Sequence, residues 1–343
     1  MDNEENRKGI LPGRNPNSQL STLNSPFFPS PVAALGLVLL AFAGMQAASL
    51  LWHLLFPSAR ESVSARYVEI LVQQCLMMAL PVALYLLRKR PRATALRLRG
   101  LPVGTCLCLV LAAVATMFAT SMFITLWALL MEALGLPMVG SGVPTPGGTG
   151  ELWLSLLVIG IAPALCEELL FRGALLPSLE GLGTRPALVI SGLVFALMHG
   201  QITVLPAHLL LGFVLGYLLV GYGSLLAPML FHAAYNGASM TVSYLLRNIT
   251  LEQAEQPALT AEVIAGIVPM MLIAGLAAWL LIRLPMGRAA RGKNPPPRYE
   301  PSGERLPAGA KALLALLLFY FVFIYAANML MAAHWAGVGA IPS

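Results

Sequence analysis

The chain has 343 residues, of which 58% are hydrophobic and only 10% are charged, whereas an ordinary soluble domain carries about 25% charged residues. A soluble fold of this length could not bury so much apolar surface, so the composition excludes a soluble globular protein. The net charge of +6 does not indicate a nucleic-acid surface, because six of the 21 Lys and Arg fall in 88–99 and seven in 283–311. Both segments are short loops beside apolar runs, as the positive-inside rule expects of a membrane protein.

Apolar runs of about 20 residues, which are long enough to cross a bilayer as helices, recur along the chain. They predict an all-α, polytopic transmembrane bundle with eight or nine spans. The runs lie at 32–56, 67–87, 104–131, 152–178, 186–200, 204–222, 224–246, 261–284 and 312–333.

The basic loops predict the orientation of these spans. Six spans separate the two basic segments, which therefore lie on the same side, and the 132–151 connection contains no Lys or Arg. We therefore expect a cytoplasmic N-terminus and a translocated 132–151 loop. The predicted parts are a disordered cytoplasmic tail (1–30), helices 1–3 (31–150), a central transmembrane core (151–247) and C-terminal helices (248–343) with a Pro/Arg-rich cytoplasmic loop (285–311).

The span 152–178 carries three charged residues far from its start. Glu168 and Arg172 are four residues apart, so they share a helix face and are predicted to form a structural ion pair. Glu167 is rotated by about 100° from Glu168 and finds no cation on its own helix. Because a charge at the centre of a span costs roughly 3 kcal/mol, an unpaired carboxylate at this depth indicates function.

Two further spans each contain a histidine paired with another residue four positions away. Phe195 and His199 are four residues apart, as are His232 and Asn236, so each pair is expected on one helix face. Counting about 1.5 Å per residue from the cytoplasmic ends places Glu167, His199, His232 and Asn236 in the middle third of a ~30 Å core. Polar groups at one depth most simply share a cavity. The remaining histidines are interpreted as core or span-end residues: His53, His208 and His334.

This set of groups supports two kinds of chemistry. A carboxylate base and an imidazole can activate water for attack on a carbonyl, and an imidazole and an amide can donate hydrogen bonds to the developing oxyanion. Glu167, His199 and His232 could instead hold a divalent metal such as zinc. The sequence contains neither HExxH nor GxSxG, so the common zinc-protease and serine-nucleophile patterns fail. Cys166, in apolar surroundings, is predicted to be an inert thiol.

Three motifs in this region resemble those of the CPBP family, the CAAX protease and bacteriocin-processing (ABI, Rce1-like) intramembrane endopeptidases. The segment 167–172 (EELLFR) is similar to the family's EExxxR motif, 195–199 (FALMH) to FxxxH, and 232–236 (HAAYN) to HxxxN. The resemblance covers about 151–240, roughly a quarter of the chain, with the three motifs in the family's order and spacing.

The resemblance implies an intramembrane endopeptidase that cleaves a membrane-associated protein or peptide, of CAAX-like or bacterial peptide-processing type. By similarity, Glu167 and His199 would activate the water, His232 and Asn236 would line the oxyanion hole, and Glu168 and Arg172 would support the site. A glutamate-type endopeptidase is expected to need no cofactor, whereas a metal-dependent one would hold a divalent metal such as zinc. The implied location is a bacterial plasma membrane, with the lipid bilayer and an anchored substrate as partners and no nucleic acid.

Two other functions use the same buried cluster. A proton-coupled transporter would relay protons through the carboxylate and imidazoles, although such proteins often show internal repeats, and none is found in this sequence. A non-catalytic membrane scaffold could retain the fold without the reaction, although every motif position is intact.

Overall fold

The computed structural model describes residues 29–57, 62–89, 96–136, 143–248, 259–291 and 305–338. Within these ranges the chain is helical and forms no strand. The α-helices are α1 (Pro31–Leu55), α2 (Val63–Val72), α3 (Leu80–Lys89), α4 (Val103–Ala133), α5 (Thr149–Ser155), α6 (Ala162–Glu168), α7 (Leu176–Leu179), α8 (Thr184–Leu197), α9 (Leu205–Tyr222), α10 (Leu226–Leu246), α11 (Ala261–Arg291) and α12 (Ala308–Val338).

π-helical segments join several of these helices into continuous rods. The segment η4 (Gln73–Ala79) links α2 to α3, whereas η5 (Leu156–Ile161) and η6 (Leu169–Leu175) flank α6. A short 3₁₀ turn, η7 (Glu180–Leu182), closes the second rod. π-helical turns of this kind occur frequently at functional sites.

Each of the nine predicted spans forms a helix, and the prediction of an all-α polytopic bundle is confirmed. Seven helices in the described part of the chain are long and apolar enough to cross a membrane. The other two predicted spans form α8, with 14 residues, and α10, whose 21 residues include the polar His232 and Asn236. The protein is therefore an integral, multi-pass membrane protein.

The predicted loop at 285–311 begins later than expected. The helix α11 continues through Pro285 to Arg291, because a proline near a helix end removes one hydrogen bond without forcing the helix to stop. The helix α12 then starts at Ala308. The proline run 295–297 and most of the predicted N-terminal tail lie outside the described residues.

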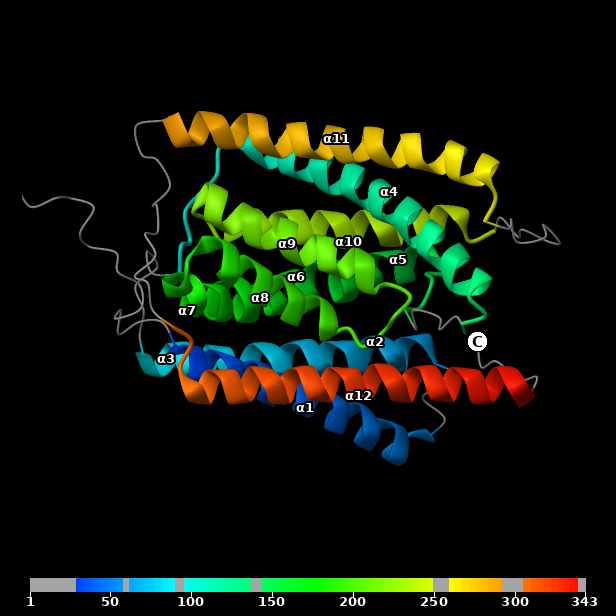
Figure 1. The fold of residues 1–343 in the computed structure, drawn as a ribbon, viewed down its shortest axis with the longest axis horizontal. Helices are drawn as coiled ribbons and strands as arrows, with labels where there is room; N and C mark the ends of the chain where they lie inside the picture. Colours follow the sequence, from blue (N-terminus) through cyan, green and yellow to red (C-terminus); the bar gives the residue numbers. More distant parts are fainter. Residues whose placement is uncertain are drawn as a thin grey trace, which may run out of the picture.

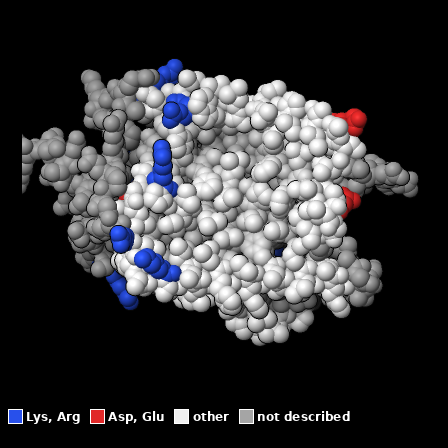
Figure 2. Space-filling model, in the orientation of Figure 1, with Lys and Arg blue, Asp and Glu red and all other residues white. Residues whose placement is uncertain are grey.

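The helices run side by side along the long axis of the molecule (Figure 1), and charge separates between their two ends (Figure 2). The basic end gathers the exposed residues Arg88, Arg99, Arg185, Arg288 and Lys311. The acidic end carries Glu132, Glu151 and Glu262, together with Arg66 and Arg247. By the positive-inside rule, the basic end is predicted to face the cytoplasm.

The α8–α9 hairpin stops short of the acidic end, where α4 and α12 extend further (Figure 1). At 1.5 Å per residue, the 14 residues of α8 span about 21 Å, less than a ~30 Å hydrocarbon core. The turn that follows therefore lies at membrane depth, where exposed backbone groups need partners. Trp127 of α4 donates to the Ile202 carbonyl at 3.0 Å, and Asn328 of α12 donates to the Gly200 carbonyl at 2.8 Å.

Candidate active site

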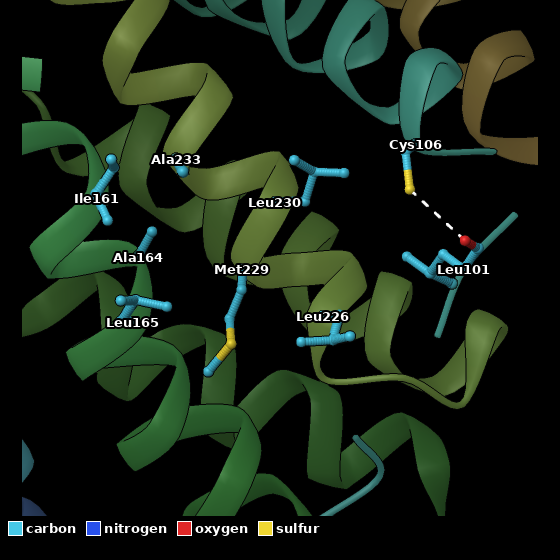
Figure 3. Close-up of a pocket in the computed structure, with 9 residues that line it drawn as sticks. All are labelled: Leu101, Cys106, Ile161, Ala164, Leu165, Leu226, Met229, Leu230 and Ala233. Carbon is cyan, nitrogen blue, oxygen red and sulfur yellow. Dashed lines mark hydrogen bonds between the residues drawn. The ribbon is translucent and has the colours of Figure 1, made fainter. Parts of the chain in front are cut away.

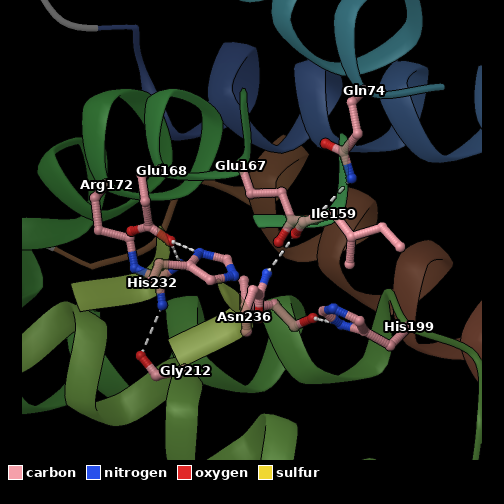
Figure 4. Close-up of polar contacts among 10 residues, drawn as sticks. Gln74, Ile159, Glu167, Glu168, Arg172, His199, Gly212, His232 and Asn236 are labelled. Carbon is pink, nitrogen blue, oxygen red and sulfur yellow. Dashed lines mark hydrogen bonds and ion pairs between the residues drawn. The ribbon is translucent and has the colours of Figure 1, made fainter. Parts of the chain in front are cut away.

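Glu167 is the last residue but one of α6, and only 5% of it is exposed. Gln74, in the π-helical segment η4, donates its amide hydrogen to Glu167 Oε1 at 2.9 Å (Figure 4). The other carboxylate oxygen, Oε2, is buried and has no hydrogen-bond partner. One oxygen therefore fixes the orientation of the carboxylate while the other is left available for a ligand.

Glu168 is the centre of a fully buried polar network. Its Oε1 accepts from Arg172 Nη1 at 3.2 Å and from His232 Nδ1 at 2.9 Å, so the predicted Glu168–Arg172 pair is present. Arg172 Nη2 also donates to the Gly212 carbonyl of α9 at 2.8 Å, and its guanidinium lies 4.5 Å from the centre of the Phe195 ring. This network joins four helical segments around one carboxylate.

A close glycine contact places α8 against α9 beside this network. A Cβ atom on Gly212 would lie 2.7 Å from the carbonyl oxygen of Gly192, which is shorter than any real contact of that kind. The absence of side chains at both positions therefore allows the two backbones to approach. This approach presents the Gly212 carbonyl to Arg172.

His199 lies in the turn just after α8, not within a helix as its spacing predicted. The helix ends at Leu197 because Gly200, with φ +67°, adopts the left-handed conformation that terminates helices. Even so, His199 Nδ1 still meets the Phe195 carbonyl at 2.9 Å. His208, which sequence reasoning treated as a core residue, stacks on His199 with 3.7 Å between ring centres.

Asn236 of α10 compensates for a proline in the neighbouring rod. Pro163 has no N–H, so it cannot donate to the carbonyl four residues earlier, that of Ile159. The Asn236 side chain donates to that carbonyl at 3.0 Å. One N–H of the amide is therefore occupied, and the second remains for a ligand.

These side chains surround one cavity of about 440 Å³. Glu167, His199, His232 and Asn236, the four predicted catalytic residues, all line it, and so do Gln74, His208 and Tyr235. Glu168 and Arg172 are not among the lining residues and lie behind His232. Figure 4 shows the polar groups from four separate segments directed toward this common space.

The hydrogen bonds determine which nitrogen of each histidine ring carries the proton. A carbonyl accepts only, and so does a carboxylate paired with Arg172, so His199 and His232 each donate from Nδ1. In the neutral rings Nε2 is then an acceptor. Nε2 of each ring therefore acts as an acceptor, and His232 can donate from Nε2 only in its imidazolium form.

The comparisons with known proteins concern this same region. Residues 149–238 match the family model described as type II CAAX prenyl endopeptidase Rce1-like. This segment, about a quarter of the chain, is similar to an Rce1-like domain and is called the Rce1-like domain below. This family consists of proteases, and the predicted family resemblance is confirmed. No curated protein and no solved structure gives a match.

The Rce1-like domain contains six predicted site residues, but sequence reasoning missed two polar residues that contact them. Gln74 precedes the matched region and meets Glu167 across 93 positions of sequence, which no local spacing could reveal. His208 was interpreted as a core residue because a lone histidine in an apolar helix is more often one. The short α8–α9 hairpin is what brings this residue to the depth of His199.

The proposed metal set was Glu167, His199 and His232. Among the described residues, no group of three or more His, Cys, Asp or Glu side chains is arranged so that it could hold a metal ion. As the structure places them, these three side chains do not form a three-ligand metal centre.

A second cavity, of about 420 Å³, lies between the Rce1-like domain and the start of α4 (Figure 3). It is an apolar groove, and none of its lining residues borders the polar cavity. The groove is lined by Leu101, Cys106, Ile161, Ala164, Leu165, Leu226, Met229, Leu230 and Ala233.

Proposed function

We propose that the protein is an intramembrane endopeptidase in which Glu167 activates a water molecule for attack on a peptide carbonyl. The observation that carries this proposal is the asymmetry of the Glu167 carboxylate. Its Oε1 is held by Gln74, whereas its buried Oε2 lacks a protein partner in a side chain that lines the cavity. A carboxylate fixed in this way is oriented to accept a proton from water.

In the proposed reaction, the water oxygen bonds to the carbonyl carbon while its proton passes to Glu167. The C–N bond then breaks, and Glu167 returns the proton to the leaving amine. His199 supports the first step, because its Nε2 is an acceptor that can hold the second hydrogen of the same water. A positioned general base of this kind contributes about 10²–10⁴-fold to the rate.

The developing oxyanion requires donors, and the geometry ranks the two proposed ones. Asn236 retains one N–H after its bond to Ile159, so it can donate at once. His232 is fixed by Glu168 through Nδ1 and donates from Nε2 only as an imidazolium. We therefore assign the oxyanion first to Asn236, with His232 as a second donor when it is protonated.

The cavity gives less support to the alternative function of a proton-coupled transporter. None of the residues that line it lies at the basic end of the bundle, so the lining describes a site with access from one end. A transported ion would need access to both ends in turn. A bacterial plasma membrane and a membrane-associated substrate remain part of our proposal.

The test compares wild type with Glu167→Gln, which keeps the size of the side chain and removes its basicity. Both are purified in detergent and incubated with a peptide library that represents membrane-proximal segments. We expect the rate to fall by about 10³-fold in the variant, with unchanged elution and unfolding temperature. Equal cleavage by both proteins, or no cleavage by either, would remove the basis of the proposal and favour the scaffold reading.

A zinc chelator separates the two chemical mechanisms. We expect wild-type activity to persist in the chelator, because the described residues form no metal-ligand group of three. Loss of activity that is restored by added zinc would contradict the glutamate-type reaction and return Glu167, His199 and His232 to the role of ligands.

A further inference from the structure

The cavity around Glu167 continues toward one end of the bundle. On α10, the residues His232, Asn236, Ser239 and Ser243 all line it, and their spacing of four, three and four places them along one helix face. Because α10 begins at the basic end, successive members of this series lie progressively closer to the acidic end (Figure 1).

The α2 rod contributes a matching series to the same cavity. Arg66, Ile70, Gln73 and Gln74 line it at spacings of four, three and one, again on one face. The rod starts at the acidic end, so Arg66 lies nearest that end and Gln74 nearest Glu167. We call the space lined by these two series the α2–α10 passage.

The rim of the passage is formed by the segment that precedes α5. Val143, Pro144 and Thr145 line the cavity, and Val143 and Thr145 are exposed. This segment belongs to the connection between α4 and α5, which contains no Lys or Arg. The short α8–α9 hairpin leaves room for the cavity at this end, since its turn stays at membrane depth.

The lining of the passage is chemically suited to a polypeptide backbone. Asn236, Gln73, Ser239, Ser243 and Thr145 all carry hydrogen-bonding groups. From Asn236 to Ser243 the rise along α10 is about 10 Å, the length of about three residues of extended chain. An extended segment needs partners for its N–H and C=O groups away from water, whereas a prenyl or acyl chain does not.

We infer that the substrate is an extracytoplasmic polypeptide segment, which reaches Glu167 in extended form through the α2–α10 passage from the acidic end. This inference rests on the proposed function for its chemistry and on the positive-inside rule for its side. It differs from the activity in the family description, prenyl endopeptidase, because a prenylated chain end in the cytoplasm would approach from the basic end.

The side of the opening can be tested without any peptidase activity. Ser243→Cys and Arg288→Cys are expressed separately in bacterial cells, with the wild type and its four cysteines as the labelling blank. A membrane-impermeant maleimide added to intact cells should label Ser243→Cys above the blank and leave Arg288→Cys unlabelled, while both react in permeabilised membranes. The reverse pattern would overturn the inference.

The route to Glu167 is tested on the same two variants in detergent. Cleavage of a peptide that is a substrate of the wild type is measured before and after reaction with a bulky maleimide. We expect modification of Ser243→Cys to reduce cleavage at least about tenfold, and modification of Arg288→Cys to leave it unchanged. Equal rates before and after modification of Ser243→Cys would refute the passage as the route.

The two failures are distinguishable. If no peptide is cleaved by any form of the protein, the proposed function fails while the labelling pattern still reports which side the cavity opens to. If the wild type cleaves peptides but Ser243→Cys is labelled only in permeabilised cells, the endopeptidase stands and the extracytoplasmic substrate is rejected.

Discussion

The polar cavity and the apolar groove are of nearly equal size, about 440 and about 420 Å³, and both use α6 and α10. Pro163 and Glu167 of α6 line the cavity, whereas Ala164 and Leu165 line the groove. The difference arises from helical periodicity, since neighbouring residues project about 100° apart. One helix pair thus carries a hydrogen-bonding site on one face and an ordinary lipid-facing surface on another.

The two regions also differ in how tightly they are held. Leu165 is 49% exposed and Ile161 is 45% exposed, so the groove side chains have room to adjust. Around the cavity, Glu168 and Arg172 are completely or almost completely buried and bonded to other segments. Substitutions should therefore be costly near the cavity and tolerated in the groove.

The largest effect on stability is expected for Arg172→Met. Removing one member of a buried ion pair costs about 3–5 kcal/mol, and the Gly212 carbonyl also loses its donor. Unfolding in detergent micelles measures this loss. Leu165→Ala is the matched groove variant on the same rod, with an expected loss below about 1 kcal/mol, because lipid replaces the contacts it gives up. Equal losses would contradict the comparison.

The next effect is a loss of activity in Asn236→Ala. Removal of one oxyanion donor costs about 10²–10³-fold in kcat, and the Ile159 carbonyl is left without its side-chain partner. Steady-state kinetics on a cleaved peptide give the value. Met229→Ala, on the groove face of the same helix, should stay within about twofold of wild type. A comparable fall in Met229→Ala would show that the two faces are not independent.

A smaller effect on stability is expected for Gly212→Ala. The new methyl group would lie 2.7 Å from the Gly192 carbonyl oxygen, so α8 and α9 must separate at a cost of about 1–3 kcal/mol. Gly266→Ala, in α11, meets nothing within 4 Å and should stabilise its helix by up to about 1 kcal/mol. Thermal unfolding of both variants checks the sign of each change.

The smallest effect is expected for Gln74→Leu. The lost hydrogen bond is worth about 1 kcal/mol, which corresponds to about a fivefold fall in rate. Because Gln74 orients Glu167, the fall should appear in kcat with KM unchanged. Leu76→Ala, at an exposed position of the same rod, provides the control. A change in KM alone would indicate that Gln74 contacts substrate.

Much of this site could be predicted from spacing and depth. The separation of four residues identified the Glu168–Arg172 pair, and depth counting indicated that Glu167, His199, His232 and Asn236 share a cavity. The catalytic roles assigned to them stay predictions. The sequence also predicted the nine helical spans, because apolar runs of about 20 residues favour helices in a membrane.

Other features depended on tertiary geometry. The position of His199 beyond the end of α8 follows from the left-handed Gly200, and the stacking of His208 follows from the shortness of α8, which places the turn at membrane depth. The His232–Glu168 bond changed the expected role of His232, because it determines which nitrogen carries the proton. None of these contacts has a periodic signature in the sequence.

The hydrogen bond from Asn328 to the Gly200 carbonyl bears on whether the matched segment could form its site in another protein. Asn328 lies in α12 and Gln74 in η4, both outside the matched segment 149–238. The flanking helices thus complete the turn that holds His199 and the carboxylate that faces the cavity. The segment therefore does not form the site alone. Moving it into another protein would remove the hydrogen bonds from Asn328 and Gln74 that hold the site in place.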